Sequence, residues 1–433
     1  REGEPLDREA YARGTSVYLV DRVIPMLPFE LSNGICSLNE GVDRLAMACE
    51  MILGPDGEVR SYEIVPAVIR VYRRLTYNIV NQILVEQAPA AVEKNRDLVP
   101  MLATLAALRE ARKSVRHRRG AIDFDLVKVK LDAEGRPIEL IKRTGSLSES
   151  IVEECMLLAN ETVARHMEVR ELPFLYRVHE QPNAEKIERL NSLLGAFGLH
   201  IRPNQEGEIR PVDVQQVLER VIGRPEERIV SAVSLRSMQQ ARYADQSLGH
   251  FGLAARYYTH FTSPIRRYPD MMVHRILTSV LVRKAPEKEE YLATVAQTTS
   301  QQEKTATEAE RASIKYKQVE YLSSHVGEVF DGLITGIVDY GFYVELVDSK
   351  CEGLVSVREL TDDVYLFYAD EFLLRGSHTG QEFRLGDSLR VRVLRTDLEY
   401  RRIDFALEEM HRNPRPKRGN GGGAWRKKSQ RRR

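Results

Sequence analysis

The sequence pattern of the chain changes near residue 326, and this change restricts the possible fold more than any other feature. Short apolar runs follow one another at 330–337, 342–346, 353–357, 388–394 and 403–407, and glycines stand at several of the breaks between them. Short strands with glycine at the corners are typical of a small closed barrel, because glycine tolerates the sharp bends that closure requires. We therefore predict a β-barrel over residues 324–409.

The chain before this point has a different organisation, with strands first and helices later. Two apolar runs at 45–53 and 58–65 flank a Gly-Pro-Asp-Gly turn, and a second strand pair is expected at 127–131 and 137–141. The segment 77–119 between them has helical periodicity and a strongly basic end. Residues 149–322 are mostly helical and close with a long polar helix from about 291 to 323. This order indicates an α+β fold in which helices cover the sheet.

Length and composition fit a globular protein of about three units. The chain has 433 residues, of which 42% are hydrophobic and 29% charged. It contains no apolar run near the roughly 20 residues that span a membrane, and its N-terminus has no signal pattern, so we expect no membrane association and a cytoplasmic location. No cysteine belongs to a C-x-x-C pair, so we expect reduced core thiols in place of a zinc site at Cys36, Cys49, Cys155 and Cys351.

Positive charge collects at the C-terminal end. The chain carries a net charge of +1, but residues 412–433 contain ten Lys or Arg and no acid, which leaves −9 on the remainder. So dense a block of like charge does not pack, and the glycine-rich run at 419–423 favours flexibility. We predict a disordered basic tail over residues 410–433 that contacts phosphates, with Trp425 offering a face for base stacking. The alternative is a tail that serves only solubility.

Residues 249–275 carry the most specific motif of the chain. They read Gly-His-Phe-Gly-Leu-Ala at 249–254, Tyr-Thr-His-Phe-Thr-Ser-Pro-Ile-Arg-Arg-Tyr-Pro-Asp at 258–270 and Val-His-Arg at 273–275. Together with stretches at 5–39 and 151–160, they resemble the catalytic domain of the ribonuclease II/ribonuclease R (RNB) exoribonuclease family. The glycine and aromatic pattern at 327–355 resembles the S1 RNA-binding domain, which is an OB-type barrel. We therefore expect an N-terminally incomplete RNB domain at 1–323, an S1 domain at 324–409 and the tail at 410–433.

The resemblance implies a processive enzyme that hydrolyses single-stranded RNA from its 3′ end and releases 5′-mononucleotides. Such a protein would take part in RNA degradation and turnover, and we expect it to be a monomer. The Arg-Arg-Tyr-Pro-Asp string and the basic tail favour the R type within the family. In that type, the tail is expected to help engage structured RNA or a ribosome.

The resemblance also assigns roles to individual residues. Tyr18 corresponds to the aromatic residue that clamps the terminal nucleotide, and Phe124 to a second stacking aromatic residue. Arg266 corresponds to the arginine that grips the scissile phosphate, where a guanidinium can stabilise growing negative charge. Glu153 and Glu310 match acidic residues that contact the sugar or the terminal nucleotide, and Arg266 and Glu310 are the expected catalytic residues.

Further RNA contacts are expected from the neighbouring arginine and from the barrel, namely Arg267, Phe330, Phe342 and Tyr343. Each role has an alternative: Tyr18 and Phe124 could be ordinary core aromatic residues, and the arginines could pair with acids on a helix. The histidines at 250, 260 and 274 match no metal-ligand spacing, so we expect them to serve packing and hydrogen bonding.

The carboxylates that would hold metal ions are missing from the sequence pattern. Two-metal phosphodiester cleavage needs several converging carboxylates, which the family takes from an aspartate cluster near the start of its catalytic domain. The only Asp-x-Asp surrounds Phe124, and Asp362-Asp363 lies in the barrel. We therefore predict no metal ligand in this chain, Mg²⁺ ligands upstream of Arg1, and an isolated chain that binds RNA without cutting it. The alternative is a non-catalytic, S1-containing RNA-binding protein.

Overall fold

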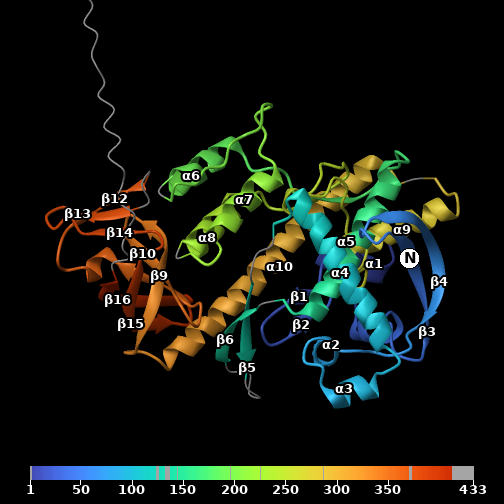
Figure 1. Ribbon diagram of the computed structural model, residues 1–433, viewed down its shortest axis with the longest axis horizontal. Coiled ribbons are helices and arrows are strands. Elements are labelled where there is room, and N and C mark those ends of the chain that lie inside the picture. Colours follow the sequence, from blue (N-terminus) through green and yellow to red (C-terminus); the bar gives the residue numbers. More distant parts are fainter. Residues whose placement is uncertain are drawn as a thin grey trace, which may run out of the picture.

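The computed structural model describes residues 2–122, 126–131, 137–143, 145–195, 197–224, 226–285, 287–369 and 373–411. An α+β body lies at one end and a β-barrel at the other, and the long helix α10 (Glu289–Ser323) runs between them (Figure 1). The predicted α+β class is confirmed. The predictions for Phe124 and for residues 412–433 lie outside the described residues.

The strands of the body pair two by two. The predicted hairpin at 45–65 is confirmed as β3 (Asp43–Leu53) and β4 (Val59–Arg70), and the second predicted pair as β5 (Leu126–Leu131) and β6 (Pro137–Arg143). Two shorter pairs join segments that the sequence pattern does not reveal: β1 (Val17–Tyr18) with β2 (Val23–Ile24), and β7 (Tyr176–Val178) with β8 (Arg242–Ala244). The described body strands therefore form separate ladders, and helices pack against them.

Helices make up most of the body. They are α1 (Pro5–Arg13), α2 (Tyr77–Leu84), α3 (Pro89–Lys94), α4 (Val99–Arg119), α5 (Leu147–Glu168), α6 (Ala184–Gly195), α7 (Pro211–Val221), α8 (Glu227–Ser237) and α9 (Tyr268–Leu281). The sequence marks several of their ends: Ser146 and Glu149 form a capping box at α5, and the Asn183 side chain accepts from the Lys186 N–H at α6. Helices α5, α9 and α10 bury their apolar faces in one shared core.

The predicted barrel is confirmed. Strands β9 (Val329–Val338), β10 (Gly341–Leu346), β11 (Glu352–Ser356), β15 (Ser388–Asp397) and β16 (Arg402–His411) close in the order β10-β11-β16-β15-β9. Gly341 is required at its corner, because a Cβ there would lie 2.2 Å from the Val355 carbonyl oxygen. An additional three-stranded sheet, which the sequence pattern did not predict, is inserted between β11 and β15: β12 (Tyr365–Tyr368), β13 (Leu373–Gly376) and β14 (Glu382–Arg384).

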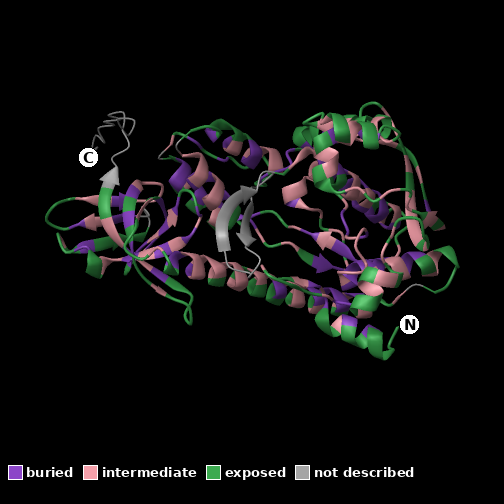
Figure 2. Cartoon of the chain, turned by 90° about the horizontal axis from the view of Figure 1, so that it is seen from below, coloured by how far each residue is buried: buried purple, intermediate pink, exposed green. Residues whose placement is uncertain are grey.

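The barrel is attached to the body by packing as well as by chain continuity. Val319 and Leu322, near the end of α10, are buried in the barrel core, so this helix belongs to both parts (Figure 2). From α8, Arg236 donates to the Thr335 carbonyl oxygen at 3.0 Å, and Arg228 forms an ion pair with Glu345. These contacts fix the orientation of the barrel relative to the body.

Candidate nucleic-acid interface

One extended segment, Thr15–Tyr18, links the residues that the sequence motifs singled out. Gly14 precedes this segment. It has φ +68° and approaches α10 so closely that a Cβ would lie 2.1 Å from Gln302 Oε1. Along this segment, the Ser16 N–H donates to the Arg266 carbonyl oxygen at 2.9 Å. Two residues later, the Tyr18 N–H donates to Glu310 Oε1 on α10 at 2.8 Å. The structure thus brings together Tyr18, Arg266 and Glu310.

The exposure of these side chains fits contact with a ligand. Tyr18 is 45% exposed, which argues against the alternative of a core aromatic residue. Arg266 and Glu310 are half-buried. The Arg266 side chain has no hydrogen bond or ion pair to any residue that the structure describes, whereas the Glu310 carboxylate is engaged by the backbone of Tyr18. The cluster therefore offers an aromatic face and a guanidinium available to a phosphate.

The turn that carries Arg266 treats two adjacent arginines differently. The Arg267 guanidinium donates twice to Asp270, from Nε to Oδ2 and from Nη2 to Oδ1, both at 2.7 Å. The Asp270 side chain is fully buried, and that of Arg267 is only 15% exposed. Arg267 is therefore committed to an internal ion pair, so we remove it from the expected RNA contacts. Asp270 already neutralises its charge and accepts from two of its N–H groups.

The histidines behind this turn have the packing role that the sequence pattern suggested. Burial lowers the pKa of His250 to about 3, and the same cause holds the pKa of His260 well below its ordinary value. His260 Nδ1 lies 2.8 Å from the Tyr243 hydroxyl, and His274 Nε2 lies 2.8 Å from the Phe261 carbonyl oxygen. These rings are neutral, hydrogen-bonded parts of the core.

Glu153 lies apart from the cluster in the described contacts. It is on α5 with its side chain 59% exposed, and its carboxylate is 4.0 Å from Arg116 Nη1. The neighbouring Glu154 is buried and accepts from the same Arg116 nitrogen at 2.9 Å. No hydrogen bond or ion pair within the described part of the chain joins Glu153 to the Thr15–Tyr18 segment or to Arg266. Its expected sugar contact therefore stays a prediction.

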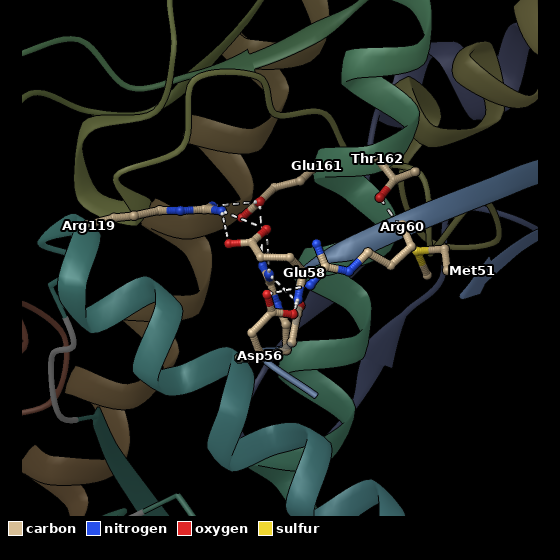
Figure 3. Close-up of polar contacts among 9 residues, drawn as sticks. Met51, Asp56, Glu58, Arg60, Arg119, Glu161 and Thr162 are labelled. Carbon is tan, nitrogen blue, oxygen red and sulfur yellow. Dashed lines mark hydrogen bonds and ion pairs between the residues drawn. The ribbon is translucent and has the colours of Figure 1, made fainter. Parts of the chain in front are cut away.

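Two arginines at the basic end of α4, Arg112 and Arg116, are buried, whereas Lys113, Arg118 and Arg119 are exposed. Arg112 is 1% exposed and donates to the Gly57 carbonyl oxygen at 3.0 Å. Its Nη2 lies 3.6 Å from Glu161, and Arg119 bonds the same glutamate at 3.1 Å and Glu58 at 3.2 Å. Figure 3 shows Arg119 reaching from α4 toward both carboxylates. This ion-pair cluster, made of Arg112, Arg119, Glu58 and Glu161, ties α4 to α5 and to the β3–β4 turn.

The barrel exposes a different aromatic pair from the one expected. Phe342 is 0% exposed and stacks on Phe383 inside the barrel with ring centroids 4.8 Å apart, so its ring faces are unavailable for base stacking. Phe330 is partly buried against the same core. In contrast, Tyr340 is 51% exposed, and its hydroxyl lies 3.1 Å from that of Tyr343. We therefore replace Phe342 with Tyr340, whose position in the turn before β10 could have indicated exposure.

Asp363, the second member of the aspartate pair in the barrel domain, has a structural role. Asp363 accepts from the backbone N–H groups of His378 and Thr379, at 3.0 and 2.6 Å, and from the Thr379 hydroxyl at 2.6 Å. Burial opposes ionisation, but these hydrogen bonds outweigh it and lower the pKa of Asp363 well below its ordinary value. Asp363 therefore anchors the turn after β13 and has no free oxygen directed at a metal ion.

A magnesium site does not fit the described residues. Hydrolysis assisted by metal ions needs several carboxylates converging on the ions. Within the described part of the chain, no group of three or more His, Cys, Asp or Glu side chains is placed to hold a metal.

All four cysteines are free, and Cys36 is exposed, so it is not the core thiol that we expected. Among the described helices, none is long and apolar enough to cross a membrane.

Comparison with known proteins gives these contacts a family context. Residues 1–283 match the RNB domain, and residues 324–408 match the S1 RNA-binding domain. Ribonuclease R 1 of Lactococcus lactis is 41% identical over 93% of this chain and 50% of its own length. Ribonuclease R of Thermotoga maritima is 42% identical over 94% of this chain and 58% of its own length.

Among solved structures, that of Mycoplasma genitalium RNase R with ribose-methylated single-stranded RNA is similar. It matches with a TM-score of 0.87 and 27% identity, over 94% of this chain and 65% of the other. The chain spans about half the length of the curated relatives it matches. The motif at 249–275, the matched domains and these relatives agree, and the chain belongs to the RNB family.

Proposed function

We propose that this chain holds the 3′ end of single-stranded RNA, and that the intact protein is a processive 3′-to-5′ exoribonuclease that releases 5′-mononucleotides. The observation that carries the proposal is the single segment, Thr15–Tyr18, that hydrogen-bonds to both Arg266 and Glu310. An exposed aromatic ring and a guanidinium without a described partner, on residues that this segment links, suit binding that does not depend on base identity. The ring stacks on any base, and the cation contacts the phosphate.

Arg266 would also serve the chemistry. A guanidinium directed at a phosphate can stabilise the negative charge that develops on its oxygens during hydrolysis. Membership of the RNB family and the similarity to an RNase R bound to single-stranded RNA support this role. We propose that Tyr18, Glu153 and Glu310 contact the terminal nucleotide, that Phe124 stacks against a base, and that Phe330, Tyr340 and Tyr343 contact RNA farther from the end.

The metal-dependent half of the reaction is a separate part of the proposal. We expect the intact protein to require Mg²⁺ and this chain alone to be inactive as a nuclease, because its described residues offer no suitable carboxylate group.

We further propose units at 1–323, 324–409 and 410–433, with the tail engaging structured RNA or a ribosome. We also propose a monomeric protein in the cytoplasm, and the free cysteines suit that reducing compartment.

The test compares linear RNA with a circular RNA of the same sequence, which has no 3′ end. We expect the chain to bind the linear strand more tightly, and Tyr18→Ala or Arg266→Ala to reduce this binding to the level of the circle. Glu153→Gln, on the exposed face of α5, provides a milder comparison. Equal affinity for linear and circular RNA would contradict recognition of the 3′ end.

The second candidate function is an S1-containing RNA-binding protein without catalysis. The lack of a metal-holding group among the described residues favours it. The two functions differ in what the intact protein does with labelled single-stranded RNA and Mg²⁺. Release of mononucleotides that stops in the Arg266→Ala variant would support the exoribonuclease, whereas binding without release would leave only the binding protein.

A further inference from the structure

We propose that Asp270 is a positioning residue that holds Arg266 in place, and that Arg267 is its structural partner. This inference rests on the proposed function in one respect, which is that Arg266 contacts an RNA phosphate. It adds a residue, Asp270, that touches no RNA and yet controls how well the phosphate is held.

The contacts of Asp270 close the turn at both ends. Its Oδ1 accepts from the Ser263 N–H at 2.8 Å, at the start of the turn, and the same carboxylate accepts both bonds from Arg267, at its end. Arg266 lies between these two anchor points. A single, fully buried carboxylate therefore holds the Ser263 backbone N–H on one side of Arg266 and the Arg267 guanidinium on the other.

The backbone of Arg266 is held as tightly as its neighbours. Its N–H donates to the Ser263 carbonyl oxygen at 3.2 Å, and its own carbonyl accepts from the Ser16 N–H at 2.9 Å and from the Thr15 hydroxyl at 3.1 Å. Only the side chain lacks a partner among the described residues. The direction in which the guanidinium leaves the backbone therefore depends on the turn, and the turn depends on Asp270.

Stability alone gives little reason for a charged pair at this position. Burying two charges costs desolvation energy that their attraction only partly offsets, and well-packed apolar residues often replace such pairs without loss. The pair does have a geometric advantage, because a bidentate guanidinium–carboxylate contact fixes both distance and orientation. Asp270 is also in the first turn of α9, where the helix dipole favours a negative charge.

A double-mutant cycle on binding of single-stranded RNA tests the proposal. We expect Asp270→Asn to weaken binding about fivefold in the otherwise unchanged chain, and by less than about twofold when Arg266→Ala is already present. A purely structural defect would weaken both backgrounds by the same factor. If Asp270→Asn does not fold, Arg267→Lys enters the same cycle, because lysine keeps the charge but loses the two-pronged contact.

The matched control is another buried carboxylate, on α1, that pairs with an arginine of α9. Asp7 pairs with Arg275 of α9 and accepts from the Tyr268 hydroxyl at 3.1 Å, but it has no described contact with the turn at 263–267. We expect Asp7→Asn to lower the melting temperature without coupling to Arg266→Ala.

The outcomes separate the two proposals. Failure of the unchanged chain to bind RNA overturns the proposed function before any substitution is made. If the chain binds, then equal effects of Asp270→Asn in both backgrounds, or an Arg266→Ala variant that binds normally, overturn the positioning role.

Discussion

The basic end of α4 and the turn at 263–270 are both rich in arginine, yet they use it differently. In the ion-pair cluster of α4, Arg112 and Arg119 face Glu58 and Glu161 at 3.1 to 3.9 Å. In the turn, Arg267 is paired in the same way, but Arg266 beside it has no described partner. The difference teaches that a basic sequence indicates a candidate phosphate site only where no carboxylate in the fold neutralises the arginine.

The largest effect should come from breaking the ion-pair cluster of α4. We expect Glu161→Ala to lower the free energy of unfolding by about 3 kcal/mol, because it removes the nearer carboxylate from Arg112, which is 1% exposed. Chemical denaturation measures this loss. Glu153→Ala, on the same helix but exposed, should change stability by less than about 0.5 kcal/mol. Equal losses for both variants would show that burial does not distinguish them.

Acid should lower the free energy of unfolding, because the histidines packed behind the turn at 263–270 are buried and neutral. His250 has a pKa of about 3 in the fold against 6.5 ordinarily, because of burial and the nearby His179 and Arg177. Between these values the unfolded chain binds more protons, so stability falls as the pH drops below 6.5, by about 1.4 kcal/mol per unit. Denaturation at pH 7 and pH 5 should show this slope. His250→Gln should flatten it, and an unchanged slope would assign the acid sensitivity elsewhere.

Substituting one arginine from each region sharpens the comparison directly. We expect Arg266→Ala to weaken binding of single-stranded RNA about tenfold. It should also reduce the steepness with which the logarithm of the affinity falls against the logarithm of the salt concentration, by about one. Arg119→Ala should leave that slope unchanged, because Glu58 and Glu161 already neutralise this arginine. A salt titration of RNA affinity measures both. A reduced slope for Arg119→Ala would mean that the α4 cluster opens toward RNA.

The smallest effect should come from the barrel, where one aromatic ring is exposed and another is buried in the core. Tyr340→Ala should weaken RNA binding about fivefold, since one stacking contact contributes about 1 kcal/mol, and should leave stability nearly unchanged. Phe342→Ala should instead destabilise the barrel, because Phe342 is buried against Phe383. Measuring affinity and thermal unfolding for both variants separates these roles. Normal RNA binding by Tyr340→Ala would remove it from the interface.

Local patterns in the sequence determined much of the architecture. The hairpin β3–β4, the helical periodicity of α4 and α5 and the glycine-cornered strands of the barrel each depend on residues close in the chain. The same holds for the motif at 249–275 that places the chain in the RNB family. Period, turn residues and caps act over a few positions, so they can be recognised without the fold. The inserted strands β12–β14 were missed because they are short and lack such a pattern.

Only the tertiary structure decided which candidate side chains are available to a ligand. Arg266 and Arg267 are the same residue type, and Asp270 is close to both in the sequence, yet the folded turn pairs Asp270 with Arg267 and leaves Arg266 without a described partner. The arginines of α4 meet carboxylates from the β3–β4 turn and from α5, across up to 61 residues. The physical reason is that neutralisation of a charge and exposure of a ring depend on groups brought together by the whole fold, whereas periodicity reports only which face of an element is apolar.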